Sequence, residues 1–159
     1  MHIRPANSNE IQTLTRVIRQ ACATVAERFG LTPENCPRNP AFYTDERVQA
    51  DLERGVRYYL LEDNAEVRGC VALEQAKPDV CYLERLAVLP EFRAQGYGTA
   101  LVHHALDQAR AFGATRVEIG IIAEDTRLKD WYARFGFVLT GTKTFDHLPF
   151  VVAFMAVDL

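Results

Sequence analysis

The chain has 159 residues, with 18 lysines and arginines against 21 aspartates and glutamates, so its formal net charge is −3. This length suits one ordinary domain, and 48% hydrophobic with 25% charged residues is typical of a soluble globular protein. Nucleic-acid binders are usually strongly basic, so the acidic balance argues against DNA or RNA as a partner. No apolar run approaches the length of about 18 residues that a membrane helix requires.

The cysteines and the N-terminal residues limit which compartment and which cofactors we expect. Four cysteines are present and form no Cys-x-x-Cys pair, which predicts neither a metal site nor a redox motif. No apolar segment follows the first five residues, so we expect no secretory signal. We therefore expect residues 1–159 to form a single cytoplasmic domain without metal and without nucleic-acid or membrane partners.

The chain opens with a short predicted strand at residues 2–6, followed by a capping box of Asn7 and Glu10. Apolar residues at spacings of three and four then predict a helix over residues 11–29. Residues 31–43 contain three prolines and predict a long irregular loop. Two interpretations of this loop stay open: the wall or lid of a pocket, and a rigid surface connection packed by aromatic residues.

The remaining elements predict a mixed sheet. After a short helix at 45–54, three strands joined by tight turns imply an antiparallel meander. A helix then crosses over to another strand, which implies one parallel pair, and a shorter helix and two more strands complete the chain. The expected ranges are 56–62, 67–75 and 80–89 for the meander, 98–112 and 116–122 for the crossover, and 125–135, 137–145 and 150–157 for the last elements.

The most informative stretch is Leu86-Ala87-Val88-Leu89-Pro90 followed by Arg93-Ala94-Gln95-Gly96-Tyr97-Gly98. A loop with two glycines that opens directly into a helix presents consecutive backbone N–H groups at the positive end of the helix dipole. Such an end binds phosphate without a lysine. The lysine of a P-loop is missing here, and Leu101 stands where a dinucleotide-binding loop needs its third glycine.

The whole stretch resembles the central motif of the GNAT superfamily of N-acetyltransferases, a strand L-x-V-x-P followed by a loop R/Q-x-x-G-x-G/A and a helix. The run from Trp131 to Phe137, WYARFGF, similarly resembles that superfamily's later motif L-Y-x-K-x-G-F. The order of elements also agrees, so the resemblance covers nearly the whole chain. It implies an α/β fold of the GNAT type, with a mixed and mostly antiparallel sheet that splays at its central strands between flanking helices.

The resemblance also implies acetyl-coenzyme A as the acyl donor, needing no metal. Its binding residues would lie on the strand edge beside the pantetheine arm, on loop amides that hold the pyrophosphate, and at the start of the later helix. Asp125 stands where relatives commonly carry asparagine and could act mainly as a helix cap. In order, these residues are Leu86, Ala87 and Val88; Arg93, Ala94, Gln95, Gly96, Tyr97, Gly98 and Thr99; and Asp125 and Leu128.

Glu84 is the predicted general base. Because side chains alternate along a strand, Val80, Tyr82, Glu84, Leu86 and Val88 are expected on one largely apolar face. A carboxylate on such a face is costly unless it is paired or has a task, and burial would raise its pKa toward the range useful for a base. The alternative is a structural ion pair across the sheet, for example with Arg68.

Tyr132 is the predicted general acid, because it matches the tyrosine that this superfamily places near the thioester sulfur. The alternative is a core aromatic residue on the stripe of Leu128 and Phe135. The N–H of Val88 is expected to hold the thioester carbonyl.

The acceptor is predicted to be the primary amine of a small molecule, cationic or hydrophobic, beside Phe29, Phe42, Tyr43 and His147. The alternatives are a protein or peptide amine and a non-catalytic sensor or partner module that binds acyl-coenzyme A. Gly120 stands where peptide-acetylating relatives often carry arginine, which weakens the peptide alternative. Homodimers are common in the superfamily, so a homodimer is a further expectation.

Overall fold

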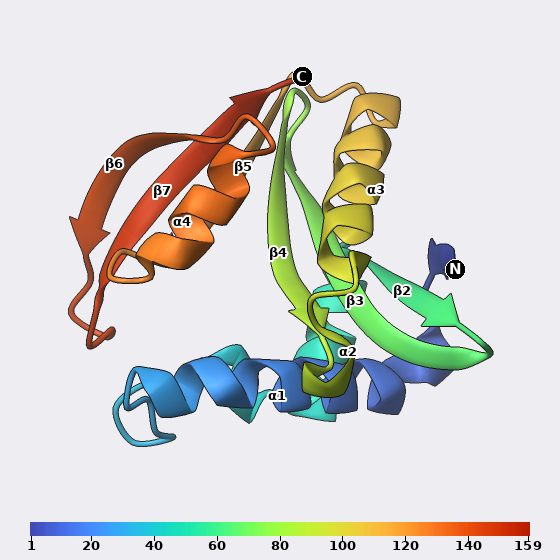
Figure 1. Ribbon diagram of the computed structural model, residues 1–159, viewed down its shortest axis with the longest axis horizontal. Coiled ribbons are helices and arrows are strands. Elements are labelled where there is room, and N and C mark those ends of the chain that lie inside the picture. Colours follow the sequence, from blue (N-terminus) through green and yellow to red (C-terminus); the bar gives the residue numbers. More distant parts are fainter.

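The computed structural model describes every residue from Met1 to Leu159 and contains one seven-stranded sheet in the order β1-β2-β3-β4-β5-β7-β6 (Figure 1). The strands are β1 His2–Pro5, β2 Arg57–Asp63, β3 Glu66–Lys77, β4 Val80–Val88, β5 Arg116–Ile122, β6 Val138–Thr144 and β7 Val151–Asp158. The helices are α1 Ile11–Arg28, α2 Asp45–Glu53, α3 Tyr97–Ala111 and α4 Thr126–Ala133, with 3-10 turns at Ser8–Glu10, Pro40–Phe42 and Pro90–Phe92. None of the helices is long and apolar enough to cross a membrane.

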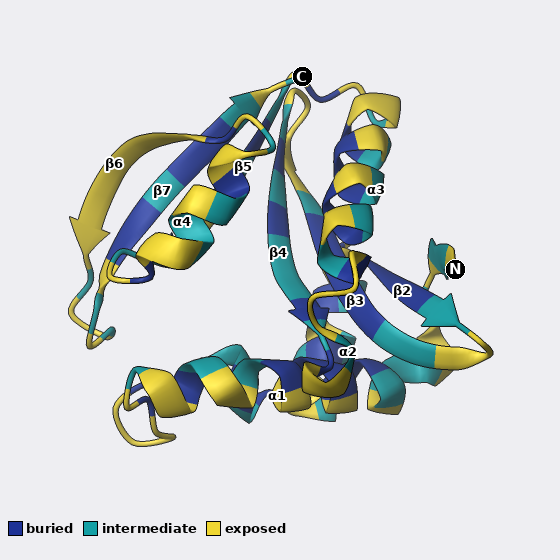
Figure 2. Cartoon of the chain, viewed as in Figure 1, coloured by how far each residue is buried: buried dark blue, intermediate teal, exposed yellow.

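The topology confirms the predicted meander and crossover. Strands β1 to β4 pair antiparallel in sequence order, while β4 and β5 are parallel and are joined through α3. Apolar side chains on one face of β2–β4 pack against α1 and α2, and those on the other face pack against α3, in a cluster that α4 and β5 complete. Figure 2 shows these buried surfaces between the layers, whereas β6 is exposed along its whole length.

Strands β4 and β5 pair over only three residues each. The last pair is Tyr82 with Glu118, although β4 continues to Val88 and β5 to Ile122. Beyond that pair the two strands diverge, as Figure 1 shows, and the edge of β4 is left without a strand partner on that side. This splay confirms the sheet geometry that the resemblance implied.

A β-bulge in β4 overturns the predicted single face for Glu84, Leu86 and Val88. Glu84 opposes Ala72 and Ala87 opposes Cys70, so two residues of β4 face one residue of β3. Arg85 lies at this bulge with φ +48°, and the extra residue shifts the alternation that follows it. Directly opposed residues share a face. Glu84 therefore lies on the α1/α2 face, while Leu86 and Val88 pack with the cluster under α3 and α4.

The loop between α1 and α2 packs against the loop between β6 and β7. Leu31, Cys36 and Ala41 form a small buried cluster with the end of α1, and Leu148 and Phe150 pack against it. The predicted proline-rich loop is therefore an ordered connection that joins the two halves of the splayed sheet.

Candidate active site

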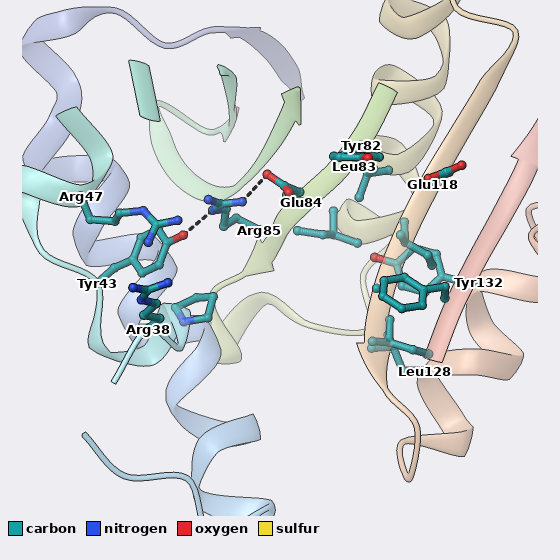
Figure 3. A pocket seen from close by; sticks show the side chains of 16 residues that line it. Arg38, Tyr43, Arg47, Tyr82, Leu83, Glu84, Arg85, Glu118, Leu128 and Tyr132 are labelled. Atoms are coloured by element: carbon teal, nitrogen blue, oxygen red, sulfur yellow. Dashed lines mark hydrogen bonds and ion pairs between the residues drawn. The ribbon is translucent and has the colours of Figure 1, made fainter. Parts of the chain in front are cut away.

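The divergence of β4 and β5 opens a cavity of about 610 Å³ (Figure 3). Its floor comes from the facing parts of the two strands. One wall comes from the α1–α2 loop and α2, and the opposite wall comes from α4. The cavity thus lies between the two halves of the sheet, at the point where the backbone of β4 has lost its neighbour.

The loop that leads into α3 offers six consecutive backbone amides, from Ala94 to Thr99, that donate no hydrogen bond within the chain. Ala94 and Gly96 both adopt positive φ, +61° and +87°, which turns successive N–H groups toward one side. These donors lie at the N-terminus of α3, where the helix dipole is positive. They form the kind of cradle that a pyrophosphate requires.

The backbone amide of Arg93 is not available for the predicted contact with a pyrophosphate. This amide donates to the Pro90 carbonyl across the 3-10 turn, at 3.3 Å, and so is not part of the free run. The guanidinium of Arg93 donates to the Ala21 carbonyl at 2.7 Å, the Thr24 hydroxyl at 2.9 Å and the Val88 carbonyl at 3.3 Å. This side chain links the loop to α1, and the run of unpartnered amides begins one residue later, at Ala94.

The free edge of β4 presents Val88 toward the gap. The Leu89 amide donates to the Arg68 carbonyl on β3 at 2.9 Å, and successive residues of a strand point their backbone groups to opposite sides. The N–H of Val88 therefore points away from β3, and its carbonyl is the one that Arg93 reaches. By the same alternation Ala87 directs its backbone groups to β3, and its side chain is buried toward α1.

At the other side of the gap, Asp125 begins α4 and makes two contacts with one oxygen, Oδ1. It accepts the Leu128 amide at 3.2 Å as a helix cap and the guanidinium of Arg28 at 2.7 Å as an ion pair. The capping interpretation is confirmed, and the ion pair additionally links α4 to the end of α1. Leu128 lines the cavity one turn into the helix.

Tyr132 reaches the cavity from α4. Its ring packs edge-on against Trp131 and Phe137, and only 5% of the residue is exposed. Its hydroxyl has no hydrogen-bond partner in the chain and points into the cavity in Figure 3. Burial raises the pKa of the phenol, which keeps it protonated as a proton donor must be.

Glu84 reaches the same cavity from β4, with 29% of its side chain exposed. Burial raises the pKa of this carboxyl, and the neighbouring Arg85 guanidinium only partly opposes the shift. Glu84 is bonded to Arg85, while Arg68 is occupied by Tyr97 and Asp63. The alternative of a cross-sheet pair with Arg68 is therefore wrong, because the ion pair of Glu84 is with its neighbour on β4.

Asp51 lies behind the site and was not singled out by the sequence; it contacts Arg47 and Arg85, which line the cavity. It is fully buried, and its carboxylate accepts from the Tyr58 hydroxyl at 2.7 Å and from three arginines. Those arginines are Arg54 at 3.0 Å, Arg85 at 3.1 Å and Arg47 at 3.3 Å. Burial alone would raise the pKa of Asp51, but the Tyr58 hydrogen bond and the Arg85 charge lower it.

Only one of the four predicted acceptor residues lines the cavity. Tyr43 does so, with its hydroxyl accepting from Arg85 Nε at 2.7 Å. Phe29 and Phe42 instead pack against the small cluster under the α1–α2 loop. His147 is exposed and lies against Phe145. Two arginines that the sequence did not point to, Arg38 and Arg47, line the wall in their place.

Residues 22–137 match the Acetyltransferase (GNAT) family, and the chain belongs to that family. It is 34% identical over 93 residues to an amino-acid acetyltransferase of Neisseria meningitidis; the match covers 58% of this chain and 20% of that protein. It is 31% identical over 106 residues to an uncharacterized N-acetyltransferase of Escherichia coli strain K12, covering 65% and 61%. The chain thus spans only a fraction of the length of the curated relatives it matches.

Solved structures confirm the fold. The ribosomal-protein-S18-alanine N-acetyltransferase of Escherichia coli superposes with a TM-score of 0.78 at 16% identity, covering 99% of this chain and 92% of that one. A putative acetyltransferase of Salmonella typhimurium with acetyl-CoA gives 0.75 at 18% identity, covering 100% and 94%. The residues present here fit that coenzyme, because the unpartnered amides suit its pyrophosphate and the open β4 edge suits its extended arm.

Proposed function

We propose that residues 1–159 act as a single acetyl-coenzyme A dependent N-acetyltransferase that acetylates the primary amine of a small molecule. One observation carries the proposal. Glu84 and Tyr132 reach the same cavity from β4 and from α4, beside an open strand edge and a run of unpartnered amides. A proton acceptor, a proton donor and an anion cradle are what amine acetylation requires of a protein.

The bound coenzyme would supply the acetyl group as a thioester, held at its pyrophosphate by the amides from Ala94 to Thr99. Glu84 would take the proton that the amine nitrogen loses as the new C–N bond forms. The Tyr132 hydroxyl would give a proton to the sulfur when the C–S bond breaks. The N–H of Val88 would stabilise the charge that develops on the carbonyl oxygen; loss of such a donor costs about 3–4 kcal/mol.

A small acceptor is favoured over a peptide by the packing of the loops beside the cavity. The α1–α2 loop packs against the β6–β7 loop, so both acceptor-side loops are engaged with each other. Gly120 lines the cavity, so this position offers no arginine side chain to contact a peptide. The relatives point in both directions: amino-acid acetyltransferases by sequence, and a ribosomal-protein acetyltransferase by fold.

A second candidate is a module that binds acyl-coenzyme A without turnover. The observation in its favour is that the carboxylate of Glu84 is already bonded to Arg85, which competes with the role of a free base. Its donor site would be identical, so coenzyme binding cannot distinguish the two candidates, whereas turnover of an amine can.

The test is release of free thiol from acetyl-coenzyme A in the presence of a broad panel of primary amines, with calorimetry of coenzyme A binding in parallel. Turnover of any amine above the no-amine rate supports the enzyme. Binding without turnover across the panel supports the module, and the absence of both overturns the proposal.

Tyr132→Phe tests the assigned proton donor. The ring stays in place against Phe137, and only the cavity-facing hydroxyl is lost. We expect kcat to fall about 10- to 100-fold, while coenzyme A affinity stays within about twofold. An unchanged kcat would remove Tyr132 from the mechanism.

A further inference from the structure

Two guanidinium groups line the acceptor wall of the cavity and have unused hydrogen-bond donors. Arg38, on the α1–α2 loop, is exposed and makes no hydrogen bond or ion pair within the chain. Arg47, on α2, uses only its Nε, toward Asp51, so both of its terminal nitrogens are free. A guanidinium presents paired N–H groups that match an oxyanion in two-point contact.

The charges around this wall are balanced except at Arg38. The network around the buried Asp51 joins three arginines, at 47, 54 and 85, to three carboxylates, at 51, 74 and 84. Arg38 stands outside it. The residues that line the cavity carry three arginines and two glutamates, which leaves an excess of one positive charge. A ligand with a single negative charge would neutralise that excess.

We propose that the acceptor is an amino acid or a similar amine that bears a free carboxylate, with the carboxylate bound by Arg38 and Arg47. This inference rests on the proposed function, because it specifies the substrate of the same site. It replaces the cationic or hydrophobic amine expected from the acidic composition of the chain, since the local charge of the wall is opposite to the net charge.

The order of groups across the cavity matches such a molecule. Figure 3 shows Arg38 and Arg47 on one side, Glu84 in the middle and Tyr132 on the far side. A carboxylate on the arginines would therefore direct the amine toward Glu84, with the acetyl donor beyond it.

Tyr43 holds the arginine wall in place. Two guanidinium groups lie against its ring, with Arg47 at 5.1 Å and Arg85 at 5.2 Å from the ring centroid. Contacts of a cation over an aromatic face are attractive, so Arg47 is positioned before any ligand arrives. Ordering the wall in advance lowers the entropy that binding would otherwise cost.

The experiment compares kcat/KM for the standard L-amino acids with that for their carboxamides, which keep the amine and lose the negative charge. The amine of a carboxamide is less basic than that of the acid, so amine reactivity alone favours the carboxamide. We expect the best acid to exceed its own carboxamide by about 10- to 100-fold, the range of a charge-assisted contact. Equal or better turnover of the carboxamides would overturn the inference and leave the proposed function standing.

Amines that carry a phosphate ester form a further arm. A phosphate brings nearly two negative charges to a wall with an excess of one, so we expect these amines to be poorer acceptors than the matched carboxylates. A clear preference for the phosphate esters would overturn the assignment of a carboxylate.

Arg38→Gln is the matched variant, because Arg38 has no partner in the fold whose loss could unfold the chain. We expect KM for the best amino acid to rise about 10- to 100-fold, with kcat and the KM of its carboxamide little changed. Arg38→Lys should recover part of the loss, since it keeps the charge without the fork. Arg16→Gln, at an exposed and unpaired arginine of α1, is the surface control. An unchanged KM in Arg38→Gln would overturn the inference.

If no amine is acetylated, the proposed function fails, but the inference is still decided by binding. Calorimetry would then measure the standard amino acids and their carboxamides against the protein saturated with coenzyme A. Binding of an acid but not its carboxamide, lost in Arg38→Gln, supports the carboxylate site. No binding of any acid overturns it.

Discussion

The two sides of the cavity present different chemical groups. The donor side is backbone: six unpartnered amides from Ala94 to Thr99 and the open edge of β4. The acceptor side is side chain: an ion-pair network around the buried Asp51, with Arg38 beside it. One side offers hydrogen-bond donors that suit an anion without a charged residue, and the other gathers charged side chains that are paired with one another.

This difference determines how each side should respond to substitution. Backbone amides belong to local loop geometry, so a change there should weaken coenzyme binding at little cost to the rest of the fold. The centre of the network on the acceptor side, Asp51 with Arg85, is buried, and removal of one of these partners leaves the other uncompensated. A change there should affect stability and acceptor chemistry together.

The largest effect is expected from Glu84→Gln. The amide keeps the shape of the side chain but cannot take a proton from the amine, so we expect kcat to fall about 100- to 10,000-fold, the range of general base catalysis. Coenzyme A binding, measured by calorimetry, should be unchanged because its site is formed by backbone. The control is Glu27→Gln, at an exposed carboxylate of α1. Wild-type kcat in Glu84→Gln would contradict the assignment of the base.

Asp51→Asn should produce the next largest effect, and it acts on stability. The change leaves three arginines around a neutral amide in a buried position, and breaking such a pair costs about 3–5 kcal/mol. The free energy of unfolding in urea measures this loss.

The matched control for Asp51→Asn is Asp107→Asn, which removes an exposed ion pair with Arg110. Exposed pairs contribute about 0–1 kcal/mol, so this variant should stay close to the wild type. Equal losses in the two variants would show that burial of the network does not matter to the fold.

The donor side could be predicted from the sequence because its chemistry resides in consecutive residues. Glycine at 96 and 98, proline at 90 and the helix that follows are local signals of a turn and a helix start, and they stand together in the chain. The element order and the parallel crossover were predictable for the same reason: they follow from periodicity and connection lengths.

The acceptor side could not be predicted because it is assembled from separate segments. Arg38, Arg47 and Arg85 each resemble an ordinary solvent-exposed arginine within its own segment, and only the fold brings them to one cavity. Asp51 lies in a short helix whose pattern gives no sign of burial. The bulge at Arg85 was equally hidden, since a residue with positive φ in a strand is set by its tertiary contacts with Asp51 and Tyr43.

A smaller effect is expected from Gly96→Ala in the donor loop. An added Cβ meets nothing within 4 Å, so the cost is conformational: φ is +87°, and the left-handed region costs a residue with a side chain about 1–2 kcal/mol. Relief of that strain would reorient the amides beside it, so coenzyme A affinity should fall by up to about tenfold.

Gly113→Ala is the control for Gly96→Ala, because Gly113 lies beyond the other end of α3 with φ +86° and the same open surroundings. It should lose similar stability and keep wild-type coenzyme affinity. Equal affinity losses in both variants would show that the effect is one of stability and not of the amide cradle.

The smallest effect concerns pH and tests how activity and stability are coupled on the acceptor side. Glu84 must be ionised to accept a proton, so kcat/KM should rise with pH through its raised pKa. Burial is the main cause of that raised pKa, and the negative charge of Glu74 adds to it. Glu74→Gln removes this charge and leaves Arg54 less neutralised, so the acid limb of kcat/KM should move to lower pH.

Stability should show the opposite dependence on pH at the same residue. A carboxyl whose pKa is raised by folding contributes stability below its unfolded pKa and loses that contribution as pH rises through the folded value. The pH at which Glu84 becomes an active base is therefore the pH at which it stops supporting the fold. Glu53→Gln, at an exposed position of α2, should leave the acid limb in place. A limb that moves equally in both variants, or not at all in Glu74→Gln, would mean that another group controls the activity.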